Sequence, residues 1–230
     1  MRARLAVLAT TVGLLLSACS GGGGHGAGAG TSLVGTFRLE PGQCTSATAA
    51  PTGSYLEVTD AADAKEVDNP QSGCANRQFT LLAPGTDGGV VTGRFQPDPT
   101  PTFDSHGNSL AASIVAPVMF QGTMLGMATN ADDEQDGPNG PPAFGVPEAS
   151  VRGTAITIDL RSLDVTYGGN PGTTCATASG VGCWNLGSKS VTGTYQPATR
   201  HFSVGWFVGE TFTPAGDSLT VHLEGTFVPS

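Results

Sequence analysis

Charged residues are scarce in this 230-residue chain, and positive charge is the scarcer sign. Asp, Glu, Lys and Arg make up 13% of the residues, with 10 Lys and Arg against 19 Asp and Glu. So few charges exclude a coiled coil, whose helices carry charged residues at helical spacing. Without a basic cluster the chain is not expected to bind nucleic acid, because proteins hold phosphate backbones through Lys and Arg. Hydrophobic residues, at 38%, argue against wholesale disorder.

Sequence motifs of enzymes are also missing. The chain contains four His, no G-x-S-x-G nucleophile elbow and no C-x-x-C motif. We therefore expect no catalytic residue and no cofactor, and we predict that the protein is not an enzyme. The alternative is a hydrolase whose catalytic residues come from distant parts of the chain, as Ser–His–acid triads do.

The first 18 residues have the pattern of an export signal. Arg2 and Arg4 supply positive charge, and the 14 residues 5–18 are mostly apolar, which is too short for a membrane-spanning helix of about 20 residues. The segment ends in Leu16-Ser17-Ala18-Cys19, which resembles the lipobox of bacterial lipoproteins. The resemblance implies cleavage before Cys19 and acylation of its sulfur, with palmitate among the acyl chains. An ordinary signal peptide with a Cys at the cleavage site is the alternative.

Three segments follow from this pattern. Residues 1–18 are the predicted lipoprotein signal peptide, and residues 19–32 are the lipidated Cys and a Gly-rich tether that behaves as a flexible chain. Residues 33–230 are expected to form a single all-β extracytoplasmic domain, long enough to bury a substantial core. The expected location is the cell membrane, with the domain anchored by lipid on its outer side.

The other four cysteines are an even number in a chain expected outside the cytoplasm, where disulfides form. Four cysteines allow three connectivities. We favour Cys44–Cys74 and Cys175–Cys183, because partners close in sequence meet most easily. Zinc binding is the alternative, and it is disfavoured because His is scarce.

Beyond the tether, Gly, Pro, Asn and Asp separate short runs rich in β-branched and aromatic residues, a pattern typical of an all-β protein. In the last run Leu219, Val221 and Leu223 alternate with polar residues, which predicts a half-buried strand. Only residues 60–67 have a briefly helical pattern. The predicted strands are residues 33–39, 54–58, 77–82, 90–95, 113–120, 123–129, 151–160, 190–195, 201–208 and 219–228.

Many short strands with frequent turns predict an antiparallel barrel or, as second choice, a β-sandwich. Gly193-Thr194-Tyr195 and Gly225-Thr226-Phe227 resemble strands of avidin and lipocalin barrels, and this resemblance places the barrel first. In an open-mouthed barrel, the face that carries Trp206 would line a ligand cavity. Trp184, beside Cys183, is either a second ligand-binding residue or packs over the disulfide.

One short sequence occurs twice. Residues 91–97 (VTGRFQP) recur as residues 191–197 (VTGTYQP). An old duplication and two independent strand–turn units are the competing explanations, because turn chemistry repeats itself.

Two groups of residues are candidate metal ligands. Asp132, Glu134 and Asp136 have the spacing of the first calcium ligands of an EF-hand, but Ala143 stands where the loop needs Glu, so only a looser calcium site or a solvated loop remains. His201 and His222 are predicted on the polar faces of their strands, with Glu224 on the same face as His222. We expect these histidines to face solvent, because a zinc pair would need at least one further ligand.

Together these patterns predict a membrane-anchored lipoprotein whose extracytoplasmic domain is a non-enzymatic binding module. Its expected partners are the membrane, through lipid on Cys19, and an unidentified ligand or envelope protein. A scaffolding protein without a small-molecule pocket and an extracytoplasmic hydrolase are the alternatives.

Overall fold

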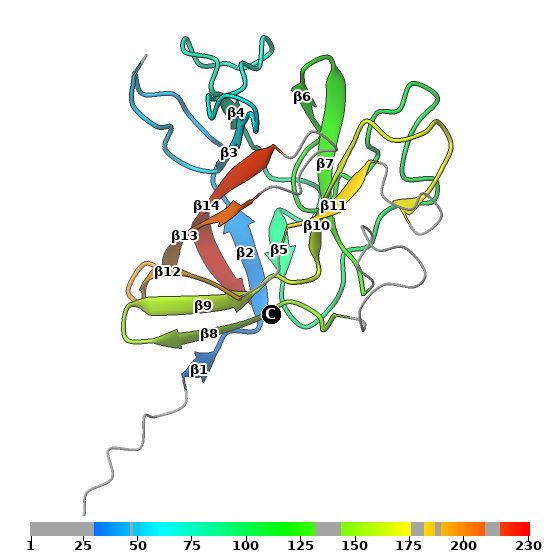
Figure 1. Cartoon of the computed structure of the whole chain (residues 1–230). Coiled ribbons are helices and arrows are strands. Elements are labelled where there is room, and N and C mark those ends of the chain that lie inside the picture. Colours follow the sequence, from blue (N-terminus) through cyan, green and yellow to red (C-terminus); the bar gives the residue numbers. More distant parts are fainter. Residues whose placement is uncertain (1–29, 47, 132–143, 176–181, 187–189, 210–216) are drawn as a thin grey trace, which may run out of the picture.

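A computed structural model of the chain (Figure 1) describes residues 30–46, 48–131, 144–175, 182–186, 190–209 and 217–230. Within these ranges the regular elements are β-strands, and each strand pairs with its neighbours in antiparallel orientation. The predicted all-β fold is therefore confirmed. The described ranges include no helix of the length and apolarity that a membrane span requires.

The strands form two sheets. The larger follows the order β1 (Thr31–Ser32), β8 (Glu148–Arg152), β9 (Ala155–Asp159), β12 (Ser190–Gln196), β13 (His201–Val208), β14 (Ser218–Pro229), β2 (Gly35–Leu39) and β5 (Gly89–Val91), with β3 (Tyr55–Thr59) on β14 and β4 (Phe79–Leu81) on β3. The smaller follows the order β11 (Cys183–Asn185), β10 (Leu163–Tyr167), β7 (Thr123–Thr129) and β6 (Val118–Phe120).

The larger sheet curls back on itself. β14 pairs with β13 along one edge, and its other edge is shared between β3 at residues 218–222 and β2 at residues 225–229. The segment that holds β1 and β2 connects both sides of this path, because β1 forms one end beside β8, while β2 lies near the other end between β14 and β5. The result is a curled half-barrel beside a second sheet (Figure 1), compatible with both architectures that the sequence predicts.

One core joins the two sheets. On the concave side of the larger sheet, the ring of Phe37 lies 5.0 Å from that of Phe202 and 4.9 Å from that of Phe227. Leu125 and Val165 of the smaller sheet are fully buried in the same cluster. The alternation of β13 and β14 follows from this packing, because every second side chain enters the core and the others point outward.

Three expectations about local structure were wrong. Residues 151–160 form parts of two strands, β8 and β9, joined by a two-residue turn in which Gly153 has φ +61°. Residues 60–67 form turns and a single bridge instead of a helix. Strands β10 and β11 were missed. The sequence of β10, Leu-Asp-Val-Thr-Tyr, does alternate apolar and polar residues, but the strand is buried on both faces, with Asp164 and Thr166 among its buried residues.

Candidate functional site

Polar side chains gather on the outer face of β13 and β14. His201 belongs to β13, and His222 and Glu224 belong to β14. Ser203 lies opposite Glu224, so His201 is the diagonal neighbour of Glu224 on the same face. The inner positions hold core side chains such as Phe202 and Leu223, and the alternation therefore directs the three polar residues outward.

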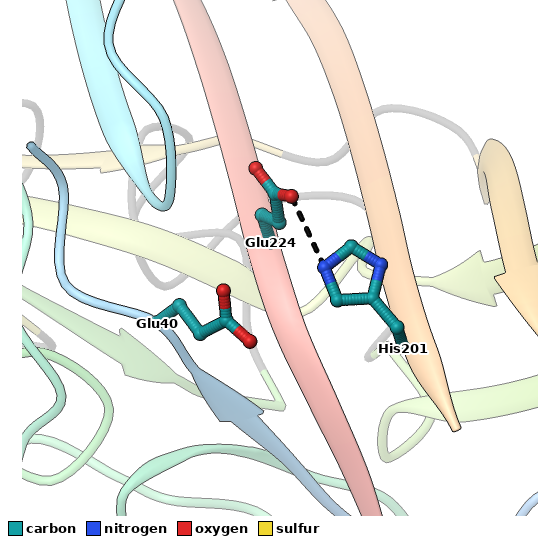
Figure 2. Close-up of side chains that lie close together, drawn as sticks. All are labelled: Glu40, His201 and Glu224. Atoms are coloured by element: carbon teal, nitrogen blue, oxygen red, sulfur yellow. Dashed lines mark ion pairs between the residues drawn. The ribbon is translucent and has the colours of Figure 1, made fainter. Parts of the chain in front are cut away.

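The Glu224 carboxylate lies between the two histidines. Its Oε1 is 3.1 Å from His201 Nε2, and its Oε2 is 3.5 Å from His222 Nε2. Glu40, directly after β2, brings a second carboxylate to the same place, and ligand atoms of Glu40, His201 and Glu224 all lie within 4.8 Å of one another (Figure 2). We call Glu40, His201, His222 and Glu224 the outer-face cluster. His201, His222 and Glu224 are half-buried, while Glu40 is exposed.

Backbone hydrogen bonds hold Glu224 in place. The amide of Glu40 donates to the Glu224 carbonyl at 2.8 Å, and the amide of Gly53 donates to Oε2 of the Glu224 side chain at 3.1 Å. The buried Ser54 hydroxyl accepts from the Glu224 amide, and it also contacts the Glu224 carbonyl, with both distances 3.1 Å. Oε2 is thus held by the protein, while Oε1 faces His201.

Tyr55 supports the other side of the outer-face cluster. Its ring stacks on the His222 imidazole, with centroids 5.0 Å apart and an interplanar angle of 24°. Burial raises the pKa of the Tyr55 hydroxyl, and the carboxylates of Glu57 and Glu224 raise it further. Tyr55 therefore stays a neutral phenol at physiological pH, and the stacking of its ring restricts the orientation of the His222 imidazole.

Sequence patterns placed His201, His222 and Glu224 on polar faces, and the structure agrees. It adds that the three are half-buried and in contact, and that Glu40 joins them. Glu40 follows the first long strand, and no spacing rule connects it with a residue 184 positions later. Only the pairing of β2 with β14 brings the two together.

A second polar group lies near the smaller sheet, with Asp164 buried and Asp98 and Asn130 half-buried. Asn130 donates from its side-chain amide to Asp98 Oδ2 at 2.8 Å and to Asp164 Oδ1 at 3.1 Å. Burial raises the pKa of Asp98 to about 6, and the hydrogen bond from Asn130 opposes this rise. Cys175 lies close to both carboxylates, but its sulfur is part of a disulfide and cannot act as a thiolate ligand.

The two predicted disulfides are confirmed. Cys44 pairs with Cys74, and Cys175 pairs with Cys183, with Cα–Cα distances of 5.5 and 5.7 Å. The Cys44–Cys74 bridge links the loop between β2 and β3 to the loop between β3 and β4. The Cys175–Cys183 bridge packs against the buried ring of Phe103.

The tryptophans occupy different environments. Trp184, in β11, is only 8% exposed and lies in the core beside Tyr167, so it offers little surface to a ligand. Trp206 is half-buried, and its indole N–H donates to the Leu186 carbonyl at 3.0 Å. Trp206 also borders a surface hollow of about 270 Å³ together with Leu186 and Phe207. Binding of a ligand at either tryptophan stays a prediction.

Several predicted site residues lie outside the described residues. These are Cys19, the expected lipidation site, and the calcium candidates Asp132, Glu134 and Asp136.

Comparisons with known proteins found no relative of this chain. The chain matches no family model, no curated protein and no solved structure. Its function must therefore be inferred from its own residues and their geometry.

Proposed function

We propose that the protein is a lipid-anchored extracytoplasmic protein whose β domain binds a ligand at its surface without catalysing a reaction. The observation that carries the anchor is Leu16-Ser17-Ala18-Cys19 directly after a short apolar segment. The two disulfides support the same location, because such bridges persist in oxidising compartments outside the cytoplasm.

The packing of the domain favours a surface site over a cavity inside the curled sheet. The concave side of the sheet is filled by aromatic rings in mutual contact, among them Phe37, Phe202 and Phe227. Rings packed this closely leave no room for a ligand between them. The outer-face cluster, by contrast, combines half-buried polar groups with access to solvent, and such convergent polar groups are what a binding site needs for orientation and specificity.

The anchor is tested by changing the predicted lipidation site. In a bacterium that expresses the full chain, we expect Cys19→Ser to abolish incorporation of labelled palmitate and to block processing at residue 19. Ser17→Ala is the matched control, because it keeps a small residue at the same place before the Cys. Unchanged labelling and membrane retention in Cys19→Ser would contradict the proposal.

A second candidate function, interaction with an envelope protein, is favoured by one observation. Phe207 is 65% exposed and borders the hollow that Trp206 also lines, and exposed aromatic side chains are enriched where proteins bind one another. A photoreactive phenylalanine at position 207 would then cross-link a defined envelope protein in cells, whereas one at the exposed Thr194 would not. Equal cross-linking from both positions would argue against a specific partner.

A further inference from the structure

We infer that the outer-face cluster binds a divalent transition-metal ion, with Glu40, His201 and Glu224 as ligands and Zn²⁺ as the ion that fits the donors best. The inference deepens the proposed surface-binding function by naming the class of ligand. It is independent of the lipid anchor, so the two proposals can fail separately.

The donor set is the first argument. A surface ion pair needs one cation and one carboxylate, but this face brings together two carboxylates and an imidazole whose ligand atoms lie within 4.8 Å of one another. Zinc takes nitrogen and oxygen donors at about 2.0–2.2 Å in a tetrahedron, and in catalytic sites three protein ligands leave the fourth position to water. Calcium prefers oxygen donors alone and takes six to eight of them. An imidazole beside two carboxylates therefore favours zinc over calcium.

The distances are the second argument. Two donors of a tetrahedral zinc ion lie roughly 3.3 Å apart, as bond lengths of about 2.0–2.1 Å require. His201 Nε2 and Glu224 Oε1 are already 3.1 Å apart. Glu40 is exposed and its carboxylate already lies within 4.8 Å of the other two donors, so a small change of side-chain rotamer completes the set.

The support around Glu224 is the third argument. Its Oε2 accepts a hydrogen bond from the Gly53 amide and faces His222 Nε2, which leaves Oε1 directed at His201. Groups that hold a ligating carboxylate in this way are typical of metal sites. We assign His222 as a positioning residue that acts through Glu224, with its own ring held by the stacked Tyr55.

The three ligands come from neighbouring strands. β13 supplies His201, β14 supplies Glu224, and the end of β2 supplies Glu40 (Figure 2). Because these strands are hydrogen-bonded to one another, the spacing of the ligands is set by the sheet itself. Sites built on strands are held more accurately than sites built on loops.

Titration of the full chain with Zn²⁺ tests the inference. The chain is purified in detergent without reducing agent, stripped with EDTA and followed by calorimetry. We expect one Zn²⁺ per chain, which Ca²⁺ does not displace. His201→Gln and Glu224→Gln should each weaken Zn²⁺ binding at least 100-fold, and Glu40→Gln at least 10-fold. His222→Gln, which removes only support for Glu224, should weaken it roughly 10-fold.

Two histidines outside the outer-face cluster provide matched controls. His106 is exposed in a turn, with Nδ1 3.9 Å from Oδ2 of the half-buried Asp104, and His25 belongs to the Gly-rich segment. His106→Gln and His25→Gln should leave the affinity for Zn²⁺ unchanged. Thermal unfolding in EDTA checks that each variant is folded, since loss of a metal ligand should not lower the midpoint of the metal-free chain.

Cobalt separates ligation from positioning. With Co²⁺ in place of Zn²⁺, His201→Gln should abolish the visible absorption of the tetrahedral ion, whereas His222→Gln should keep it with a shift. The inference is overturned if Zn²⁺ does not bind, if Ca²⁺ competes with Zn²⁺ equally well for the same site, or if Zn²⁺ binding survives both His201→Gln and Glu224→Gln. If the native chain does not bind Zn²⁺ but is labelled normally at Cys19, this inference is wrong and the proposed lipid anchor is unaffected.

Discussion

Asp98 shows how burial and hydrogen bonding oppose each other at a single residue. Its carboxylate accepts from Asn130, which also donates to Asp164, and yet removal from water dominates and raises the pKa of Asp98 from 3.8 to about 6. The folded protein therefore holds this proton more tightly than the unfolded chain does. The contribution of Asp98 to stability is greatest below pH 4 and is lost as the pH rises through 6.

We predict that Asp98→Asn reduces this pH dependence. Between pH 4 and pH 7 the free energy of unfolding of the native chain should therefore fall by about 2 kcal/mol more than that of the variant, because the shift in pKa favours the folded state only while Asp98 is protonated there. The new side chain can still accept the hydrogen bond from Asn130, because its amide carries a carbonyl oxygen. Urea unfolding at a series of pH values measures the difference.

Asp159→Asn is the control, because the shift there has the opposite sign. The hydrogen bond from Arg161 lowers the pKa of Asp159, so its contribution is present at neutral pH and is lost as the pH falls. If Asp98→Asn kept the full pH dependence of the native chain, the assignment to Asp98 would be wrong.

At the scale of elements, the repeated sequence has two different structures. Residues 191–197 lie largely in β12, which has β9 on one edge and β13 on the other. Residues 91–97 leave β5 after Val91 and turn at Gly93, where φ is +83°. β5 pairs with β2 over only three residues, so no ladder extends the first copy. The two segments have nearly the same sequence, so pairing with neighbouring strands, more than the intrinsic β-propensity of the residues, decides that residues 191–197 form a strand.

Close approach of two strands makes Gly225 of β14 essential. A Cβ atom there would lie 1.9 Å from the Arg38 carbonyl oxygen, whereas a Cβ at Gly205 of β13 would lie no closer than 3.5 Å from any neighbour. We predict that Gly225→Ala lowers the free energy of unfolding by about 2–3 kcal/mol, because the backbone of β2 must shift. Gly205→Ala should change it by less than about 0.5 kcal/mol. Denaturant unfolding of both variants checks this, and equal effects would contradict it.

At the scale of the whole molecule, two disulfides link segments that the sheets do not pair. They close loops with sequence separations of 30 and 8 residues. In the chain-entropy view, a longer loop restricts the unfolded chain more and therefore stabilises the folded state more.

We predict that removing Cys44–Cys74 with a double Cys→Ala variant costs ~4 kcal/mol, and that removing Cys175–Cys183 costs ~3 kcal/mol. Chemical unfolding without reductant measures both. A larger loss at the second bridge would show that its packing against Phe103, more than loop closure, sets its contribution.

Local patterns predicted much of the fold. β7 and β13 match their predicted ranges, and β14 differs by one residue at each end. Both disulfides were predicted as well, because of the three possible connectivities the one that joins cysteines close in sequence closes the shortest loops. β10 has the alternating pattern of a strand and could have been predicted from it, whereas β11, with three residues, is too short to show a period.

The candidate site was predictable only in part. Alternation along β14 placed His222 and Glu224 on one face, because side chains in a strand alternate with period two whatever the strand packs against. Nothing local connected them with Glu40 or identified His201 as a neighbour of Glu224.

The sequence by itself thus determined the all-β class, the pairing of the cysteines and the outward direction of the polar side chains, since each depends on local spacing or on short loops. Only the tertiary structure decided which strands are neighbours. The pairing of β13 with β14 brings His201 to Glu224, and the pairing of β2 with β14 adds Glu40 to the same cluster. Contacts between residues far apart in sequence depend on how the strands pair, and that pairing minimises the free energy of the whole core.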